Sequence, residues 1–331
     1  MNPRHPRVIA AGLVAVLVAT LGTGEARGDS TGSFVGLDGL THSWSPQVVD
    51  GADGYLFMGP DFDTACAYGD RFRHYLQRLA KLATVIERTG RTVVFTIAPN
   101  KSSALPDLVD AGSLPQGECS SVGLDLERKA LDGLSDPRYL PLRRKLASST
   151  RQVYWRTDLH WSTVGGSVFA RALARHLSPR LGRAQRYAYT TETGVGNLTA
   201  LLGDHTTTET LPRADPAGGV RVATAPGAPD WSGYPSLTYD HSWRSAPGRK
   251  TWPGRTLVLG DSFAMFALQN LRPLFRHGRF MWFAHTDPAD QVAAIADADT
   301  VVIEIVQVFT VDSELTRPSF RRAVASALGR G

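Results

Sequence analysis

Cysteine, lysine and long hydrophobic runs are all scarce in this 331-residue chain. The apolar run Val8 to Leu21 has 14 residues, fewer than the roughly 20 that a membrane-spanning helix needs. Two cysteines without histidines at suitable spacing exclude a thiolate metal site. Only five of the 36 basic residues are lysine. The arginines are scattered along the chain, so the sequence shows no cluster of basic residues of the kind that binds nucleic acid. We therefore expect no metal, no cofactor and no nucleic-acid partner.

The composition is otherwise that of a globular protein with a basic surface. Hydrophobic residues make up 42% of the chain, enough for the core of one large domain. The formal charge is +5 and the pI is near 9.3. This balance is typical of a basic solvated surface, and it would also favour contact with an anionic polymer or phospholipid headgroups. No internal repeat is visible, and we expect a monomer.

The N-terminal segment 1–28 has the order of a secretory signal. Arg4, His5 and Arg7 precede the apolar run, and small or polar residues follow it up to a plausible cleavage point after Ala26 or Gly28. This order predicts export from the cytoplasm. Because the cleavage site is imperfect, the alternative is an uncleaved anchor at the outer face of the cytoplasmic membrane.

The cysteines fit an exported chain. Cys66 and Cys119 are the only two, and in an oxidising compartment a single disulfide is the simplest interpretation. Two free buried thiols are the alternative.

Residues 29–331 read as alternating helices and strands, which predicts one α/β domain with a parallel sheet covered by helices on both faces. Residues 204–250 are rich in Pro, Gly, Thr and Trp and are expected to be an insertion of loops and short strands. The expected helices are 68–91, 162–177, 263–276 with a kink at Pro273, 287–296 and one from about 317. The expected strands are 92–98, 151–156, 256–259, 279–284 and 300–306.

Three residues form the set that acyl transfer needs. Ser262 follows a hydrophobic strand in a Gly-Asp-Ser turn, and Asp158 and His160 follow another expected strand. A serine attacks a carbonyl only if a base takes its proton, and a carboxylate must hold that base. Carboxyl ends of parallel strands share one rim of a sheet, so we expect these residues to meet. Alternatively, Ser262 only caps a helix and Asp158 only binds the next turn.

Other polar and aromatic residues are candidates for substrate binding at the same rim. Asn100 and Lys101 follow a strand and are expected to contact an oxyanion or substrate, with a loop-turn role as the alternative. Tyr154 and Trp161 flank the histidine and are expected to stack on a sugar, or else to pack the rim. His285 ends a further strand. A metal site on Asp158 and His160 would need His205 or His241 and would leave the Gly-Asp-Ser turn unexplained.

Several motifs resemble those of the SGNH hydrolase-like group typified by the alginate O-acetylation proteins AlgX and AlgJ. They run in the family's order from about residue 50 to 310: DGYLF at 53–57, PNKS at 99–102, TDLHWS at 157–162, VGNL at 195–198, GDSF at 260–263 and VVIE at 301–304. The resemblance implies a flavodoxin-like, circularly permuted SGNH fold and assigns Asp158, His160 and Ser262 as the catalytic residues. Asn197, where an acidic residue is usual, and Gln307, where arginine is frequent, depart from the pattern.

The resemblance also implies acetyl transfer to an exported polysaccharide, with a membrane-bound acyltransferase as the source of acetyl groups. We therefore expect a metal-independent serine O-acetyltransferase with an acetyl-serine intermediate. Two alternatives remain open at this point: an acetylesterase, in which water replaces the sugar hydroxyl, and a catalytically silent polysaccharide-binding component of an export complex.

Overall fold

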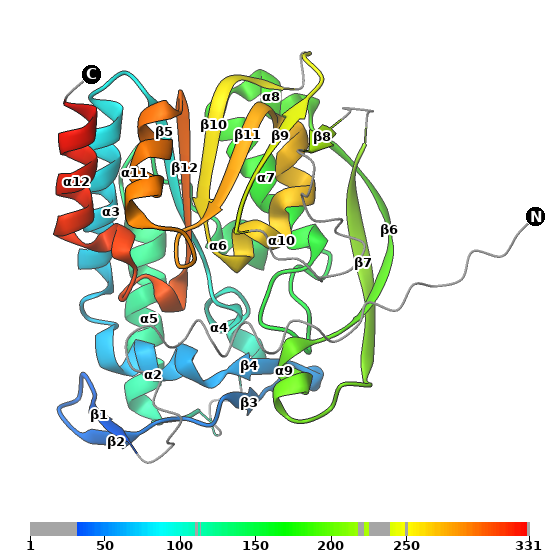
Figure 1. The fold of residues 1–331 in the computed structure, drawn as a ribbon. Helices are drawn as coiled ribbons and strands as arrows, with labels where there is room; N and C mark the ends of the chain where they lie inside the picture. The colour runs from blue at the N-terminus through cyan, green and yellow to red at the C-terminus, as the bar shows by residue number, and fades with distance from the viewer. Residues whose placement is uncertain are drawn as a thin grey trace, which may run out of the picture.

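A central sheet separates two layers of helices in the computed structural model, which describes residues 32–109, 112, 114–217, 222–224, 239–248 and 251–329 (Figure 1). The sheet has six strands in the order β5-β12-β10-β11-β9-β8. The first four are parallel, and β9 and β8 continue the sheet antiparallel. These strands are β5 (Thr92–Ala98), β12 (Thr300–Val306), β10 (Trp252–Gly260), β11 (Phe275–Trp282), β9 (Asp240–Ser245) and β8 (Val222–Thr224). The expected α/β class with a parallel-rich sheet is confirmed.

Each face of the sheet carries its own hydrophobic core, because alternate residues of a strand point to opposite faces. Val94, Val258 and Val302 pack with the helices of one layer, whereas Val93 and Leu257 pack with those of the other. The first layer contains α6 (Arg143–Ala147), α7 (Thr163–Leu177), α8 (Pro179–Ala184) and α10 (Ser262–Leu271). The second contains α3 (Phe72–Glu87), α11 (Pro288–Asp297), α12 (Pro318–Leu328) and part of α5 (Glu118–Gly133).

A smaller unit lies below the sheet in Figure 1, at the carboxyl ends of the parallel strands. Its strands are β1 (Ser33–Val35), β2 (Thr41–Ser43), β3 (Val48–Asp50) and β4 (Leu56–Met58), and its helices are α2 (Gly59–Tyr68), α4 (Lys101–Ala104) and α9 (Asn197–Leu201). Short 3-10 helices are η1 (Ala52–Gly54), η2 (Pro106–Leu108), η3 (Arg272–Leu274), η4 (Gln307–Phe309) and η5 (Glu314–Thr316).

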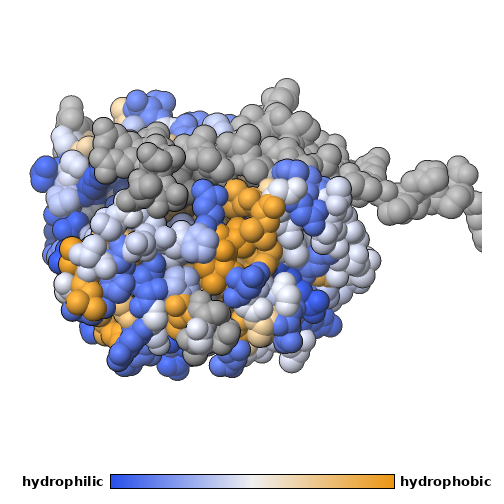
Figure 2. Space-filling model, turned by 90° about the horizontal axis from the view of Figure 1, so that it is seen from below, coloured by the Kyte–Doolittle hydropathy of each residue, from blue (hydrophilic) through white to orange (hydrophobic). Residues whose placement is uncertain are grey.

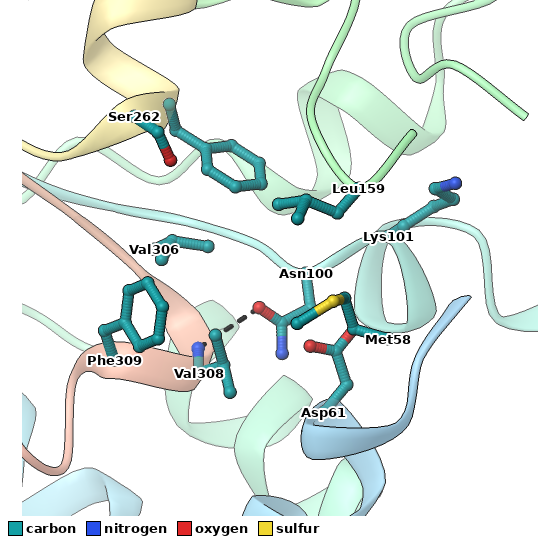
Figure 3. A pocket seen from close by; sticks show the side chains of 10 residues that line it. Met58, Asp61, Asn100, Lys101, Leu159, Ser262, Val306, Val308 and Phe309 are labelled. Atoms are coloured by element: carbon teal, nitrogen blue, oxygen red, sulfur yellow. Dashed lines mark hydrogen bonds between the residues drawn. The ribbon is translucent and has the colours of Figure 1, made fainter. Parts of the chain in front are cut away.

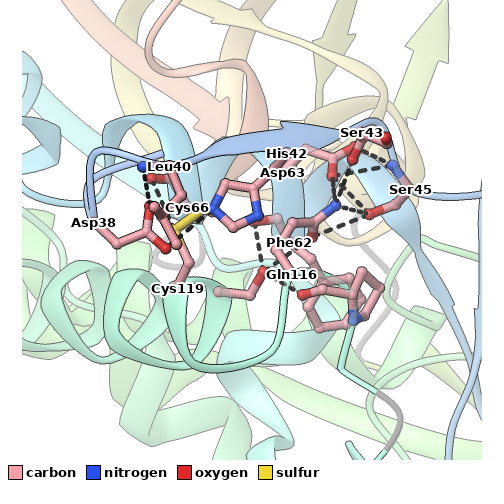
Figure 4. The surroundings of a disulfide bond; sticks show 12 residues. Asp38, Leu40, His42, Ser43, Ser45, Phe62, Asp63, Cys66, Gln116 and Cys119 are labelled. Carbon is pink, nitrogen blue, oxygen red and sulfur yellow. Dashed lines mark hydrogen bonds and ion pairs between the residues drawn. A yellow bond between two sulfur atoms is a disulfide. The ribbon is translucent and has the colours of Figure 1, made fainter. Parts of the chain in front are cut away.

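The disulfide between Cys66 and Cys119 is present and joins α2 to α5 (Figure 4). The two helices touch closely, since a Cβ on Gly123 would lie 2.0 Å from the carbonyl oxygen of Ala65. Only glycine fits there. His42 lies beside the two sulfur atoms, but sulfurs joined in a disulfide offer no thiolate to a metal.

Several sequence predictions need correction. Residues 151–156 are not a strand; Tyr154 makes only an isolated bridge to Trp161. The helix from Ser262 ends at Leu271 and continues as η3 instead of kinking at Pro273. The expected helix over 68–91 is shorter, and α2 before it was not anticipated. Strand β12 has the expected bounds.

The segment 204–250 contributes more regular structure than loops and short strands. Its strand β7 (Thr208–Ala217) pairs over ten residues with β6 (Arg186–Val195) in a long antiparallel ribbon, and β8 and β9 join the central sheet. The side chains of β9 alternate between exposed and buried, as a strand with one covered face requires.

The predicted signal or anchor over 1–28 lies outside the described residues. Within the part of the chain that the structure describes, every helix is too short or too polar to cross a membrane.

Candidate active site

The turn that carries Ser262 is held by buried carboxyl groups. Asp261 caps α10: its Oδ1 accepts the Phe263 N–H at 2.8 Å, and its Oδ2 accepts the Val306 N–H at 2.6 Å. Glu304, on the neighbouring strand β12, accepts the Asp261 N–H at 3.3 Å and the Ala264 N–H at 3.0 Å through Oε2. Side chains from β10–α10 and β12 therefore fix the turn from two directions.

These contacts leave one backbone donor at the start of α10. The N–H groups of residues 261, 263 and 264 are taken by carboxyl oxygens, whereas the Ser262 N–H has no partner among the described residues. A free N–H at a helix N-terminus is suited to an anion. Ser262 thus offers both a hydroxyl and a donor for a developing oxyanion.

The two carboxyl groups of this turn are protonated more readily than ordinary acids. Burial raises the pKa of Asp261 to about 6. Burial, and then the Asp261 charge, raise the pKa of Glu304 well above its usual value. Like charges this close resist joint ionisation, so the pair keeps a proton near neutral pH.

Asp158 and His160 form a tight pair on the segment between Tyr154 and α7. His160 Nδ1 lies 2.7 Å from Asp158 Oδ1, and the other carboxylate oxygen accepts the Asn197 N–H at 2.9 Å. Burial alone would raise the pKa of Asp158, but the His160 charge and the hydrogen bonds outweigh it and lower that pKa. The carboxylate therefore stays ionised and holds the Nδ1 proton of the imidazole.

The imidazole of His160 packs against α10, the helix whose first residue is Ser262. The ring is fully buried and stacks on Phe266 of α10, with centroids 4.0 Å apart and planes 11° apart. Its Nε2 has no hydrogen-bond partner in the described structure. Because Asp158 occupies Nδ1, Nε2 is the nitrogen that can take a proton. The neighbouring Trp161 donates from Nε1 to the Phe263 carbonyl at 2.9 Å, which locks the segment onto the first turn of α10.

The Asp158–His160 pair thus lies against the helix that begins at Ser262, but Ser262 Oγ and His160 Nε2 share no hydrogen bond in this structure. Catalytic hydrogen bonds are frequently long without substrate and tighten when it binds. The arrangement fits a nucleophile, a base and a carboxylate that orients the base.

A small cavity opens beside Ser262 (Figure 3). Its volume is about 20 Å³, and its walls are mainly apolar. Figure 3 shows Ser262 at one end and Asp61 at the other, with Asn100 between them. The lining residues are Met58, Asp61, Asn100, Lys101, Leu159, Ser262, Phe263, Val306, Val308 and Phe309. Seen from below, the face toward which the carboxyl ends of the strands point has an apolar patch bordered by hydrophilic residues (Figure 2).

Asn100 presents an amide to this cavity. It is buried, its Oδ1 accepts the Val308 N–H at 3.1 Å, and its own N–H donates to Gln307 Oε1 at 3.2 Å. Its Nδ2 has no partner among the described residues and is available as a donor.

Only the aliphatic part of the Lys101 side chain lines the cavity. Its Nζ points away from Ser262 (Figure 3) and donates to the carbonyls of Leu56, at 2.7 Å, and Arg156, at 3.0 Å. Burial lowers the pKa of Lys101 to about 7. The ammonium ties β4 to the segment before Asp158, so the expected contact with substrate has no support here.

The aromatic residues beside His160 are not a sugar platform. Tyr154 and Trp161 are fully buried in the core, and the Tyr154 hydroxyl donates to the Pro99 carbonyl at 2.6 Å. A ring without an exposed face cannot stack on a sugar, which corrects that expectation. His285 is half-buried, stacks on Tyr239 with centroids 4.1 Å apart and does not line the cavity.

Sequence reasoning missed the roles of several residues. Asp61 lies inside a helix that was not predicted, and Phe266 belongs to none of the motifs identified in the sequence. Glu304 left a signal, since it is a charged residue within the apolar run of β12. A carboxyl group on a fully buried strand must find hydrogen-bond partners, and the turn of Ser262 provides them.

Comparisons with known proteins identify the family to which the chain belongs. The family described as "SGNH hydrolase-like domain, acetyltransferase AlgX" matches residues 48–230. A Pseudomonas aeruginosa protein named "Probable alginate O-acetylase AlgJ" is 27% identical over 169 residues, which cover 51% of this chain and 40% of that protein. The chain therefore spans less than half the length of this relative.

Two solved structures share the fold. Bacillus cereus PatB1, with a sulfonyl adduct, superposes with a TM-score of 0.54 at 14% identity, covering 82% of this chain and 99% of that one. Pseudomonas aeruginosa AlgX superposes with a TM-score of 0.50 at 16% identity, covering 86% of this chain and 67% of that one. Because the family match extends over more than half of the 331 residues, the chain belongs to the AlgX family of SGNH hydrolase-like acetyltransferases.

Proposed function

We propose that this chain moves acetyl groups onto hydroxyls of a polysaccharide through an acetyl-serine intermediate. The observation that carries the proposal is the Asp158–His160 pair, whose free Nε2 lies against the helix that Ser262 begins. Membership of an acetyltransferase family gives the class of reaction.

In the first half-reaction His160 Nε2 takes the proton of Ser262 as its Oγ attacks the acetyl carbonyl. The tetrahedral oxyanion receives a hydrogen bond from the Ser262 N–H, which lacks a partner among the described residues. Preorganised donors of this kind give the largest electrostatic contribution to acyl transfer. The His160 proton then passes to the leaving group, and Ser262 is left acetylated.

In the second half-reaction a hydroxyl of the acceptor attacks the acetyl-serine. His160 takes the hydroxyl proton and returns it to Ser262 Oγ, so the enzyme ends in its starting state. Asp158 stabilises the imidazolium in both halves without accepting the proton.

The cavity supports acetyl as the transferred group. A cavity needs roughly 10–15 Å³ to hold one water-sized group, and the one beside Ser262 has about 20 Å³. A methyl group fits its apolar wall of Met58, Leu159, Val306 and Phe309, whereas a longer acyl chain requires these side chains to move.

The location, acceptor and donor complete the proposal. The N-terminal segment 1–28 would direct the chain out of the cytoplasm, as a secreted or anchored monomer. The acceptor would be an exported polysaccharide, a class suggested by the word alginate in the relative's name. Acetyl-CoA is not available outside the cytoplasm, so a membrane-bound acyltransferase would supply the acetyl group.

The test is turnover of p-nitrophenyl acetate with a panel of uronic and neutral oligosaccharides. Ser262→Ala should abolish release of p-nitrophenol, whereas Ser167→Ala, a matched control in α7 whose hydroxyl bonds only within its own helix, should retain it. An oligosaccharide acceptor should speed turnover and gain acetyl by mass spectrometry.

Other outcomes favour the rival functions. Steady release of acetate with no acetylated sugar supports an esterase, and an inactive wild-type protein supports a polysaccharide-binding component. Activity in Ser262→Ala equal to that of the wild type contradicts the serine mechanism.

A further inference from the structure

The antiparallel ribbon of β6 and β7 has no part in the mechanism above, yet it contacts the segment that carries the base. Residues 152–161, which include Asp158 and His160, form this base segment. The chain between β6 and β7 contains α9, and both α9 and the start of β7 make hydrogen bonds to the base segment. A two-stranded ribbon is marginally stable by itself, so these contacts hold the ribbon as well as the base segment.

Glu209 of β7 accepts four hydrogen bonds from the base segment. Its Oε2 accepts the N–H groups of Arg156, at 2.9 Å, and Thr157, at 3.2 Å. The same oxygen accepts the Thr157 hydroxyl at 3.1 Å, and Oε1 accepts Gln152 Nε2. One carboxyl group therefore holds the backbone directly before Asp158.

The first residues of α9 hold the same part of the base segment. The Thr157 carbonyl accepts the Leu198 N–H at 3.0 Å. Asn197 bonds to the next two residues: its N–H donates to Asp158 Oδ2 at 2.9 Å, and its Oδ1 accepts the Leu159 N–H at 2.9 Å. Because α9 and Glu209 both bind this short stretch, the carboxylate of Asp158 has little freedom to move relative to the imidazole.

The ribbon is also bound to α10, the helix that begins at Ser262. The Ala214 carbonyl of β7 accepts Asn270 Nδ2 at 3.0 Å, and Arg213 Nη2 donates to Gln269 Oε1 at 3.0 Å. The ribbon therefore connects the base segment to the nucleophile helix, in addition to the stacking of the imidazole on that helix.

We propose that Glu209 is a positioning residue for the base, and that it holds the base segment in the place from which His160 serves Ser262. This role rests on the proposed acyl transfer. Glu209 does not line the cavity and exchanges no proton, so it acts only through Asp158 and His160. Catalytic groups need such support, because a displacement of about 1 Å can cost about 100-fold in rate.

The experiment measures kcat and KM for p-nitrophenyl acetate in variants of Glu209. Glu209→Ala removes all four hydrogen bonds and should lower kcat about 100-fold, with KM little changed because the cavity walls are intact. Glu209→Gln keeps an oxygen for the N–H groups of Arg156 and Thr157 and should recover most of this loss. Thr210→Ala is the matched control and should keep the kcat of the wild type, because the exposed Thr210 bonds to Thr193 across the ribbon and not to the base segment.

A double-mutant cycle separates positioning of the base from a general loss of stability. Asp158→Asn already removes the carboxylate that orients the imidazole, so Glu209→Ala has little left to disturb in that background. Residues that act through one pair are non-additive, and the double variant should keep the kcat of Asp158→Asn to within about threefold. A defect that only lowers the folded fraction would instead reduce kcat by the same factor in both backgrounds.

The proposal is overturned if Glu209→Ala has the kcat of the wild type, if Glu209→Gln is as slow as Glu209→Ala, or if the full loss recurs beside Asp158→Asn. If Glu209→Ala does not fold, Thr157→Val decides. It removes one hydroxyl that donates to Glu209 and should lower kcat on the order of fivefold, the usual worth of one hydrogen bond; an unchanged kcat overturns the proposal. A wild type that is active while Ser262→Ala is inactive keeps the proposed function intact in each case, so the two failures are distinguishable.

Discussion

The base and the nucleophile of the candidate site are positioned by opposite kinds of electrostatics. Asp158 is ionised, and its charge and hydrogen bonds fix the tautomer of His160. The turn of Ser262 rests on Asp261 and Glu304, a buried pair that keeps a proton. An ionised carboxylate suits a residue that must stabilise a cation, whereas a pair carrying less negative charge disturbs a developing oxyanion less.

The two halves also differ in where they lie in the chain. The family match, residues 48–230, contains Asp158, His160 and Asn197 but ends before Ser262. The base half is a loop attached to α10 by ring stacking and by Trp161, and the nucleophile half is a strand-to-helix turn within the central sheet. The predictions below test the roles assigned to the two halves.

The largest expected effect is the loss of the base. His160→Ala should reduce kcat for an acetyl ester by on the order of 10⁶-fold, as removal of the base in a serine triad does. Asp158→Asn keeps the imidazole but removes the carboxylate that fixes its tautomer. This variant should lose on the order of 10⁴-fold in kcat. Steady-state kinetics measures both values.

His285→Ala is the matched control, since that half-buried histidine does not line the cavity, and it should remain active. Asp158→Asn with wild-type kcat would show that the carboxylate does not orient the base.

A smaller effect concerns the free energy of unfolding. Its dependence on pH is expected to have opposite signs for the carboxyl groups of the two halves. The lowered pKa of Asp158 means that its contribution to stability is present above the unfolded value of about 3.9 and is lost as pH falls. The raised pKa values of Asp261 and Glu304 mean that their contribution is full below about 4 and is lost as pH rises.

Thermal unfolding across pH measures this contrast. Glu304→Gln keeps an oxygen for the Ala264 N–H and cannot ionise, so its Tm should fall less than that of the wild type between acid and neutral pH. Asp158→Asn should destabilise most at neutral pH and little in acid. Parallel curves for the two variants would contradict the assignment of charge to the two halves.

The smallest expected effect is on the size of the acyl group. Leu159 comes from the base half and Phe309 from the segment after β12, and both line the cavity. Truncation of either to alanine should raise the rate with propionyl or butyryl relative to acetyl esters by roughly 10-fold, the usual worth of one methylene in an apolar pocket. Competing p-nitrophenyl and umbelliferyl esters of different length give the ratio. An unchanged ratio in both variants would show that the cavity does not hold the acyl chain.

Part of this site could be predicted from sequence, because Asn100 and Ser262 follow β5 and β10, two buried strands that the parallel sheet aligns. The run Thr300–Val306 has no polar interruption except Glu304 and was predicted with its observed bounds. Ser162 begins α7 as expected, with its side chain accepting the Gly165 N–H. Both features are local, so a short stretch of sequence is enough to predict them.

The remaining features depend on contacts between distant segments. Tyr154 and Trp161 were expected either to stack on a sugar or to pack the rim. Both are buried, because Tyr154 bonds to Pro99 and Trp161 to Phe263, and no local pattern indicates these partners. Asp61 reaches the cavity because α2 lies against η4 and against Ser102 of α4. The apparent strand over 151–156 has the right composition but finds no strand to pair with, apart from one bridge.

The most direct test of the central claim is the identity of the acylated residue. The protein is quenched during turnover of an acetyl ester without acceptor and digested, and its peptides are sequenced by mass spectrometry. The account predicts one added acetyl group on Ser262, absent in Ser262→Ala, strongly reduced in His160→Ala and discharged when a sugar acceptor is added. Acetyl on another side chain, or turnover with Ser262 never modified, would contradict it.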